Sequence, residues 1–340
     1  MKIQILEEGG PQPYNDEGLD YLIRQILLDD FDEIVYDNSR EHEFQMISRN
    51  ETLKNALKNS KTKLVLIKNG DSIEPDEEFF EGGLKIINSP FHLIRDTISE
   101  LQDVIGDIKS YKVSDFKIPI LYLNGKPHIH RCVLMNNFHK TRWVKENTKY
   151  SWVWTQKEFR GDNILQFDSW IEKQIRIDDL VDGCLNQTKQ DIEQQPFFQL
   201  VAETNDDHFF LTEKTAKPLL LKQPFLVFSN PQFHKKLKDY GFELYDEVFN
   251  YDFDFIEDMD ERSKMILTEV NKLQNYDLPS LYKKLEPKLI HNVNRCFELV
   301  NDKENNLELF DYISNRWDSF ERVINGNTIH SSYAKNLFND

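Results

Sequence analysis

Short apolar runs alternate with amphipathic segments through the first third of the chain. The runs lie in the segments 2–6, 33–37, 63–71 and 84–90, and helical periodicity appears between them at 18–31 and 51–60. Apolar runs of this length between helical segments predict parallel strands joined by crossover helices. The pattern therefore predicts a doubly wound α/β layer.

The segment from Asp16 to Asp29 shows why a sheet is expected beneath a helix. Its apolar residues recur at spacings of three and four, which places them on one helical face, whereas the acidic residues lie elsewhere. The face consists of Leu19, Leu22, Ile23, Ile26 and Leu27. We expect this stripe to cover a sheet.

The α/β pattern restarts at Ile118, after a helix predicted from His92 to about Ile108. A strand over 118–123, a loop with Gly125 and Pro127, and a helix from about His130 begin a second domain, with the boundary near Phe116. Further strands are predicted at 151–156, 197–204, 224–230 and 242–248. Residues 160–195 have weak turn signals and are interpreted as an insertion. From Leu278 to the end the periodicity predicts helices only.

Composition limits the class of protein. A chain of 340 residues with 39% hydrophobic and 30% charged residues predicts two folded domains of roughly 150 residues each. The segment MKIQILEEGG does not resemble a secretory signal, and no window is apolar enough for a membrane span. Three widely spaced cysteines indicate neither a disulfide framework nor a zinc site. We expect a cytoplasmic protein, or one in the host cytoplasm if it is viral.

Charge disfavours nucleic acid as a partner. The formal net charge of −17 repels phosphate backbones and anionic membranes. The strongest local exception is the stretch from Lys126 to Lys149, which holds six Lys or Arg residues and three His residues against the single acid Glu146. Weak binding to duplex DNA is therefore the expected outcome, unless this stretch lines a binding cleft.

Candidate chemistry lies where the predicted strands of the second domain end. Open parallel sheets bind ligands beyond the carboxyl ends of their strands, where helix N-termini and loops present N–H groups to anions. Asn124, Lys126, His130 and Arg131 follow the first strand, and the polar segment from Glu203 to Lys214 follows FFQLVA. Together these residues offer cations for a diphosphate and a carboxylate for a ribose.

Two segments resemble a known family. LTEKTAKPLLLKQPFLVFSN, followed by KLKDYGFELYDEVFNYDFDFIEDMDERSKMI, is similar to the donor-binding region of α1,3-fucosyltransferase-like glycosyltransferases, whose hallmark is a helix that begins Thr-Glu-Lys ahead of a Pro-Phe or Pro-Val strand. LYLNGKPHIHR is similar to the start of the same domain in viral and bacteriophage relatives. The resemblance covers roughly residues 118 to 275, and its most specific part is the Thr-Glu-Lys segment.

The resemblance implies a two-lobed GT-B enzyme, with two Rossmann-like domains facing a cleft, that transfers a sugar from a nucleoside diphosphate. The implied domains are 1–115 for the acceptor, 116–277 for the donor, and helices at 278–340 that pack across both. It implies no metal, no cofactor other than the nucleotide sugar as co-substrate, and inverting transfer. Glu213 would hydrogen-bond the ribose, whereas Lys214 and Arg131 would contact the phosphates. The donor-binding set is Asn124, Lys126, Arg131, Thr212, Glu213 and Lys214.

The sequence does not define the chemical identity of the donor or of the acceptor. Ser229-Asn230-Pro231 replaces the small residue or Gly that usually follows the second strand, and Phe225 stands where Val is common, so the base and sugar are not defined. The acceptor is expected to be a glycan or small molecule. A hydroxymethylated DNA base, as in phage enzymes, and a non-catalytic nucleotide-binding protein with two domains are the alternatives.

The catalytic base is expected in the first domain. Glu7 and Glu8 follow the first strand, and Asp71 follows KLVLIKNG in the same topological position. A carboxylate there would deprotonate an acceptor hydroxyl. Glu8 and Asp71 are the preferred candidates.

Structural roles explain several of the same residues. Glu213 and Lys214 fit an ordinary first helical turn with Thr212 as N-cap, and Arg131 fits a salt bridge. The HIH segment with Cys132 is not expected to bind a metal. Asp252 with Asp254, and Asp258 with Asp260, resemble the Asp-x-Asp of metal-dependent GT-A enzymes, but such pairs arise by chance in an acidic chain.

Overall fold

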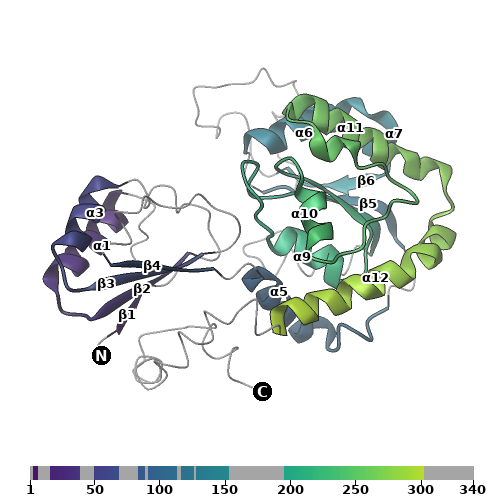
Figure 1. The fold of residues 1–340 in the computed structure, drawn as a ribbon. Coiled ribbons are helices and arrows are strands. Elements are labelled where there is room, and N and C mark those ends of the chain that lie inside the picture. The colour runs from purple at the N-terminus through teal and green to yellow at the C-terminus, as the bar shows by residue number, and fades with distance from the viewer. Residues whose placement is uncertain are drawn as a thin grey trace. The chain divides into compact units, whose positions relative to one another are not determined.

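The computed structural model describes residues 3–6, 16–38, 50–68, 83–88, 91–112, 116–125, 128–152 and 195–301. The chain divides into two compact units (Figure 1). Unit 1 comprises Met1–His92 with Asn301–Asp340, and unit 2 comprises Leu93–Val300. The division falls after His92, whereas the sequence placed a boundary after residue 115. No helix of the described ranges is long and apolar enough to cross a membrane.

Unit 1 contains a parallel sheet of four strands in the order β1-β2-β3-β4. The strands are β1 (Ile3–Leu6), β2 (Glu33–Asn38), β3 (Lys63–Lys68) and β4 (Leu84–Asn88). In their register Ile5 pairs with Val35, and Val35 pairs with Val65. This confirms the parallel strands predicted from the apolar runs.

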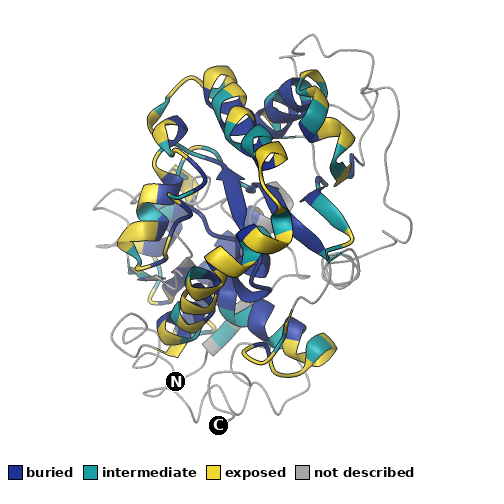
Figure 2. Cartoon of the chain, turned by 90° about the vertical axis from the view of Figure 1, so that its right-hand side faces the viewer, coloured by how far each residue is buried: buried dark blue, intermediate teal, exposed yellow. Residues whose placement is uncertain are grey.

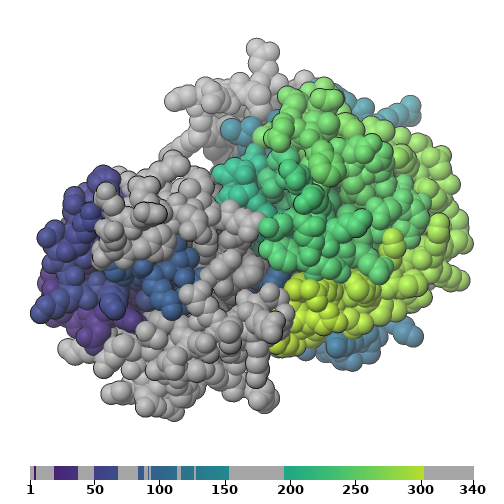
Figure 3. All heavy atoms as spheres, in the orientation of Figure 1, coloured from purple at the N-terminus to yellow at the C-terminus, as the bar shows by residue number. Residues whose placement is uncertain are grey.

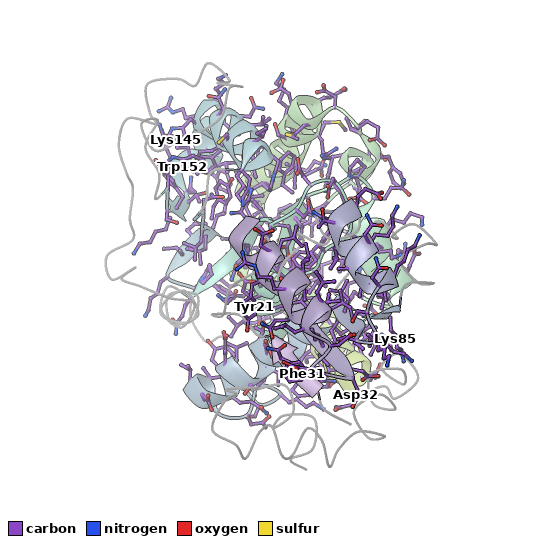
Figure 4. All side chains as sticks on the ribbon, turned by 90° about the vertical axis from the view of Figure 1, so that its left-hand side faces the viewer. Tyr21, Phe31, Asp32, Lys85, Lys145 and Trp152 are labelled. Carbon is purple, nitrogen blue, oxygen red and sulfur yellow. The ribbon has the colours of Figure 1, made fainter. Side chains whose placement is uncertain are left out.

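Helices α1 (Asp16–Leu28) and α3 (Glu51–Lys58) pack together on the sheet of unit 1. Their buried residues form one core with alternate strand residues such as Ile34, Leu64 and Leu66. Phe31, partly buried, packs against this core, which Figure 4 shows from the side of the two helices. The expected apolar stripe of α1 is thus confirmed, with one exception. Leu27 is 54% exposed because it lies about 100° around the helix from Ile26, at the rim of the stripe.

The doubly wound layer predicted for this part of the chain is wrong for the described strands. Their order is consecutive, without the reversal that defines a doubly wound sheet. Right-handed crossovers that all advance in one direction place their helices on the same face. The shared core of α1 and α3 agrees with this geometry.

Unit 2 contains a second parallel sheet of four strands, in the order β6-β5-β7-β8. The strands are β5 (Ile118–Tyr122), β6 (Thr148–Tyr150), β7 (Pro196–Ala202) and β8 (Phe225–Phe228). All seven residues of β7 and all four of β8 are buried, and Figure 2 shows these buried strands among helices. Burial on both faces explains why these strands appear in the sequence as continuous apolar runs. Here the strand order does reverse, because β6 and β7 lie on opposite sides of β5.

The helices of unit 2 surround this sheet (Figure 1). They are α5 (His92–Ile105), α6 (Ile129–Lys140), α7 (Arg142–Glu146), α9 (Glu213–Leu220), α10 (Phe233–Asp239), α11 (Met259–Asn271) and α12 (Leu278–Asn301), with 3₁₀ turns η3 (Asp252–Phe255) and η4 (Lys272–Asn275). Helix α12 confirms the helix predicted from Leu278, and its buried side carries Leu285, Leu289 and Val293. In Figure 3 it lies against the surface formed by the preceding part of unit 2. The helix predicted after Asn301 lies outside the described residues.

Two strand predictions need correction. Residues 242–248 form turns and irregular chain because side chains occupy their backbone groups: Asn292 bonds both N and O of Glu243, at 2.8 and 3.0 Å, and Lys288 Nζ donates to Leu244 O at 2.6 Å. The strand predicted at 151–156 is corrected at its start only: β6 ends at Tyr150, Ser151 is not in a strand, Trp152 forms an isolated bridge, and residues 153–156 lie outside the described residues. Residues 153–194, including most of the proposed insertion, lie outside the described residues.

Candidate functional site

The order of strands in unit 2 defines where a ligand is expected. The chain leaves β5 toward β6 on one side and returns to form β7 on the other, so the order reverses between β5 and β7. In open α/β sheets ligands bind at such a switch point, beyond the carboxyl ends of the strands. Asn124 lies two residues after β5, and Glu203 directly follows β7. The helices that begin beyond these two strands, α6 and α9, supply the remaining candidates.

The side chain of Glu203 holds the start of α9 against the end of β7. This carboxylate is fully buried and accepts hydrogen bonds from Thr212 N at 3.1 Å, Thr212 Oγ1 at 2.5 Å and Thr204 N at 3.0 Å, and from the Thr215 hydroxyl. Burial of a carboxylate is tolerated when its lone pairs are satisfied in this way. Glu203 therefore fixes the position of the first helical turn.

The backbone carbonyl of Glu203 anchors α6 to the same point. Arg131 donates to it from Nε at 3.1 Å and from Nη2 at 2.9 Å, and His130 Nε2 donates at 2.8 Å. Both side chains are buried. Burial and the neighbouring Arg131 lower the pKa of His130 to about 3, so the imidazole is neutral at physiological pH. A single residue thus connects two helix starts with the end of β7.

The first turn of α9 carries the paired charges Glu213 and Lys214. Thr212 is the N-cap, and its Oγ1 accepts a bond from Lys214 N at 3.3 Å. Lys214 Nζ donates to Glu213 Oε1 at 2.6 Å and to Thr204 Oγ1 at 3.0 Å. Burial alone would raise the pKa of Glu213, but Lys214 and Lys217 outweigh it and lower this pKa to about 2. With a quarter of each of the paired side chains exposed, both can contact a ligand.

The end of β5 carries two buried polar side chains, Tyr122 and Asn124. Ser151 clamps the backbone of Asn124 from both sides: Asn124 N donates to Ser151 Oγ at 3.0 Å, and Ser151 Oγ donates to Asn124 O at 3.2 Å. Neither the Asn124 amide nor the Tyr122 hydroxyl makes a hydrogen bond of normal geometry, although the two groups lie close enough for Asn124 to offset part of the rise that burial causes in the pKa of Tyr122. Asn124 is 3% exposed and Tyr122 is fully buried.

The structure brings five of the predicted donor-binding residues to the ends of two adjacent strands and their following helices. They are Asn124, Arg131, Thr212, Glu213 and Lys214. Lys126 and the candidate bases Glu8 and Asp71 lie outside the described residues. Sequence reasoning missed Tyr122 and Thr215, and it gave Glu203 no particular role. A glutamate directly after a buried strand, followed by Thr-x-x-Thr, is the signal that could have identified Glu203.

Asp252 and Asp254, the acidic pair that would bind a metal in the GT-A alternative, make hydrogen bonds within the fold. Asp254 accepts bonds from His234 Nδ1 at 2.8 Å, His234 N at 3.0 Å and Lys235 N at 2.9 Å, and so caps the start of α10. Asp252 accepts a bond from Asn250 Nδ2 at 2.7 Å. Across the described ranges, no three His, Cys, Asp or Glu side chains are grouped to hold a metal ion.

The basic stretch of unit 2 lies partly on its surface. Arg142 and Lys145 on α7, and Lys149 on β6, are exposed, and Arg142 pairs with Glu146 at 2.9 Å. Figure 4 labels Lys145 together with the buried Trp152. These exposed cations are separate from the buried Arg131 of the strand ends.

The sequence has no significant match among protein-family models or curated proteins.

Proposed function

We propose that unit 2 binds a nucleoside-diphosphate sugar at the carboxyl ends of β5 and β7, and that the protein is a glycosyltransferase. The observation that carries this proposal is the role of Glu203. Its carboxylate holds the first turn of α9, with Glu213 and Lys214, and its carbonyl holds Arg131. One carboxylate acceptor and two cations therefore gather at the switch point of a parallel sheet.

The chemistry of the proposed donor agrees with these side chains. Glu213 stays ionised at physiological pH, so its oxygens only accept hydrogen bonds, which suits two ribose hydroxyls. In this proposal Arg131 and Lys214 neutralise the charge on the diphosphate as it leaves. The N-terminus of α9 adds its partial positive charge.

The part of the proposal that concerns the acceptor and the catalytic base rests on the resemblance to GT-B enzymes. In it the N-terminal domain binds the acceptor, and Glu8 or Asp71 removes the proton from an acceptor hydroxyl. The acceptor oxygen then attacks the anomeric carbon of the sugar, and the bond from that carbon to the phosphate oxygen breaks. The nucleoside diphosphate leaves with the bonding electron pair, and the sugar inverts.

Calorimetry with the full chain tests donor binding. Arg131→Ala and Lys214→Ala are each expected to weaken binding of the preferred nucleoside diphosphate by about 1 to 3 kcal/mol, as loss of a charge-assisted hydrogen bond predicts. Arg142→Ala and Lys235→Ala are matched controls, because both remove exposed cations of unit 2 that pair with their own helices. Wild-type affinity in both site variants would refute the assignment.

Measuring turnover distinguishes a glycosyltransferase from a nucleotide-binding protein without catalytic activity. A panel of nucleotide sugars is incubated with the protein, alone and with saccharide acceptors, and release of nucleoside diphosphate is measured. A transferase is expected to release diphosphate from at least one donor. Tight binding without release from any donor would instead support a nucleotide-binding protein.

A further inference from the structure

The amide of Asn124 and the hydroxyl of Tyr122 are neighbouring buried polar groups that make no hydrogen bond of normal geometry within the fold. Asn124 Nδ2, Asn124 Oδ1 and Tyr122 Oη all lack hydrogen-bond partners. Their positions are nevertheless fixed, because Tyr122 belongs to β5 and Ser151 clamps the backbone of Asn124. Leaving such groups unsatisfied destabilises a protein. Their place at the switch point suggests that a ligand satisfies them.

The hydrogen-bonding capacity of these groups limits which chemical groups of a ligand can satisfy them. An amide needs both an acceptor for its N–H groups and a donor for its oxygen. Phosphate oxygens that carry no proton only accept, so a diphosphate would leave Asn124 Oδ1 with no donor other than the nearby Tyr122 hydroxyl, which does not reach it with normal hydrogen-bond geometry. Hydroxyl groups donate and accept, and two neighbouring hydroxyls can satisfy the amide and the Tyr122 hydroxyl together.

Arg131 relates this pair to the proposed donor site. Its charge interacts with Glu203, Tyr122 and Glu213. A nucleotide sugar has its ribose and its transferred sugar at opposite ends of the diphosphate. With the ribose assigned to Glu213 and the diphosphate to Arg131, Tyr122 and Asn124 are the polar groups at the end of β5 that are left for the transferred sugar.

There is room for a ligand beside Asn124. Gly125 is the next residue, and no atom outside its immediate neighbours lies within 4 Å of the position that a Cβ would take there. Open space therefore lies one residue along the chain from the covered amide.

We infer that Asn124 and Tyr122 form the part of the site that binds hydroxyl groups of the transferred sugar, and so determine donor specificity. This inference rests on the proposed function, because it uses the placement of the ribose and diphosphate. It separates Asn124 from the phosphate-binding residues Arg131 and Lys214, with which the sequence had grouped it.

The test compares nucleotide sugars with the same nucleotides lacking sugar. Calorimetry with the full chain measures the Kd of GDP-fucose against GDP and of UDP-glucose against UDP, and the tighter pair is used. Asn124→Leu is expected to raise the Kd of the nucleotide sugar about tenfold, and Tyr122→Phe about threefold, whereas the Kd of the nucleoside diphosphate changes less than about twofold. Tyr245→Phe is the matched control, since the Tyr245 hydroxyl is also buried beside an asparagine, Asn292, without a hydrogen bond of normal geometry, but its ring packs against Phe225 at the start of β8.

Thermal unfolding without ligand gives an independent readout. Because the Asn124 amide is unsatisfied, Asn124→Leu is expected to keep or raise the Tm of the free protein. Asn292→Leu should lower it, since the Asn292 amide bonds the backbone of Glu243.

The outcomes distinguish the inference from the proposed function. If the wild-type protein binds neither nucleotides nor nucleotide sugars, the proposed function fails and the inference with it. If Asn124→Leu weakens both ligands equally, Asn124 contacts the nucleotide and the sugar assignment is overturned while donor binding stands. Unchanged affinities with a lower Tm would show that the amide has a structural role, for example through a buried water molecule, and would also overturn the inference.

Discussion

Replacing Glu203 with Gln tests whether one buried carboxylate organises the site. Each carboxylate oxygen accepts one backbone N–H and one threonine hydroxyl: Oε1 from Thr212 N and Thr215, and Oε2 from Thr204 N and Thr212 Oγ1. In Gln one oxygen becomes an NH₂ group. A hydroxyl facing that group can rotate and accept, but a backbone N–H cannot. Whichever way the amide is oriented, one backbone N–H loses its acceptor.

The magnitude follows from these contacts. An orphaned buried N–H costs about 1 to 3 kcal/mol, and the remaining bonds lose their charge assistance. We expect Glu203→Gln to lower the free energy of unfolding of unit 2 by about 2 to 4 kcal/mol, which corresponds to a Tm lower by roughly 5 to 15 °C for a unit of this size. Because Thr212 caps α9, we also expect weaker binding of the nucleoside diphosphate.

Urea and thermal unfolding measure the effect in the full chain, with separate probes for each transition because the chain has two units. Glu243→Gln is the control, since Glu243 is about half exposed and its side chain pairs only loosely, at 3.9 Å, with His291. A change within about 0.5 kcal/mol of the control would refute the claim that the Glu203 carboxylate holds the start of α9 against the end of β7.

Two further predictions concern pH and metal. Glu213 has a pKa lowered to about 2 from its ordinary value of 4.5, so its contribution to stability is complete above pH 4.5 and is lost as the pH falls toward 2. Unfolding free energies measured across this window should fall less steeply for Glu213→Gln than for the wild type, and equal slopes would contradict the ion pair with Lys214. Because the proposed phosphate contacts are cationic side chains, donor hydrolysis should persist in excess EDTA. Loss of hydrolysis that manganese or magnesium restores would favour a metal-dependent mechanism instead.

Local periodicity predicted most helices and strands because each depends on residues near in sequence. The helix at 16–29, the strands before residue 90 and the long helix from Leu278 follow directly from spacings of apolar residues. The prediction at 242–248 failed because residues from far along the chain decide that segment. Asn292 and Lys288 on α12 occupy its backbone groups, and no pattern within FELYDEV contains that information.

The candidate residues could be chosen from the sequence, since polar side chains after apolar strands mark the ligand edge of a parallel sheet. Tertiary structure alone decided how they meet. Arg131 and Glu203 are 72 residues apart, and they bond only because β5 and β7 are neighbours. Strand order depends on pairing between distant segments, which apolar runs do not specify. For the same reason the sequence did not distinguish the consecutive order in unit 1 from the reversed order in unit 2, and that reversal is what places the ends of β5 and β7 at a binding position.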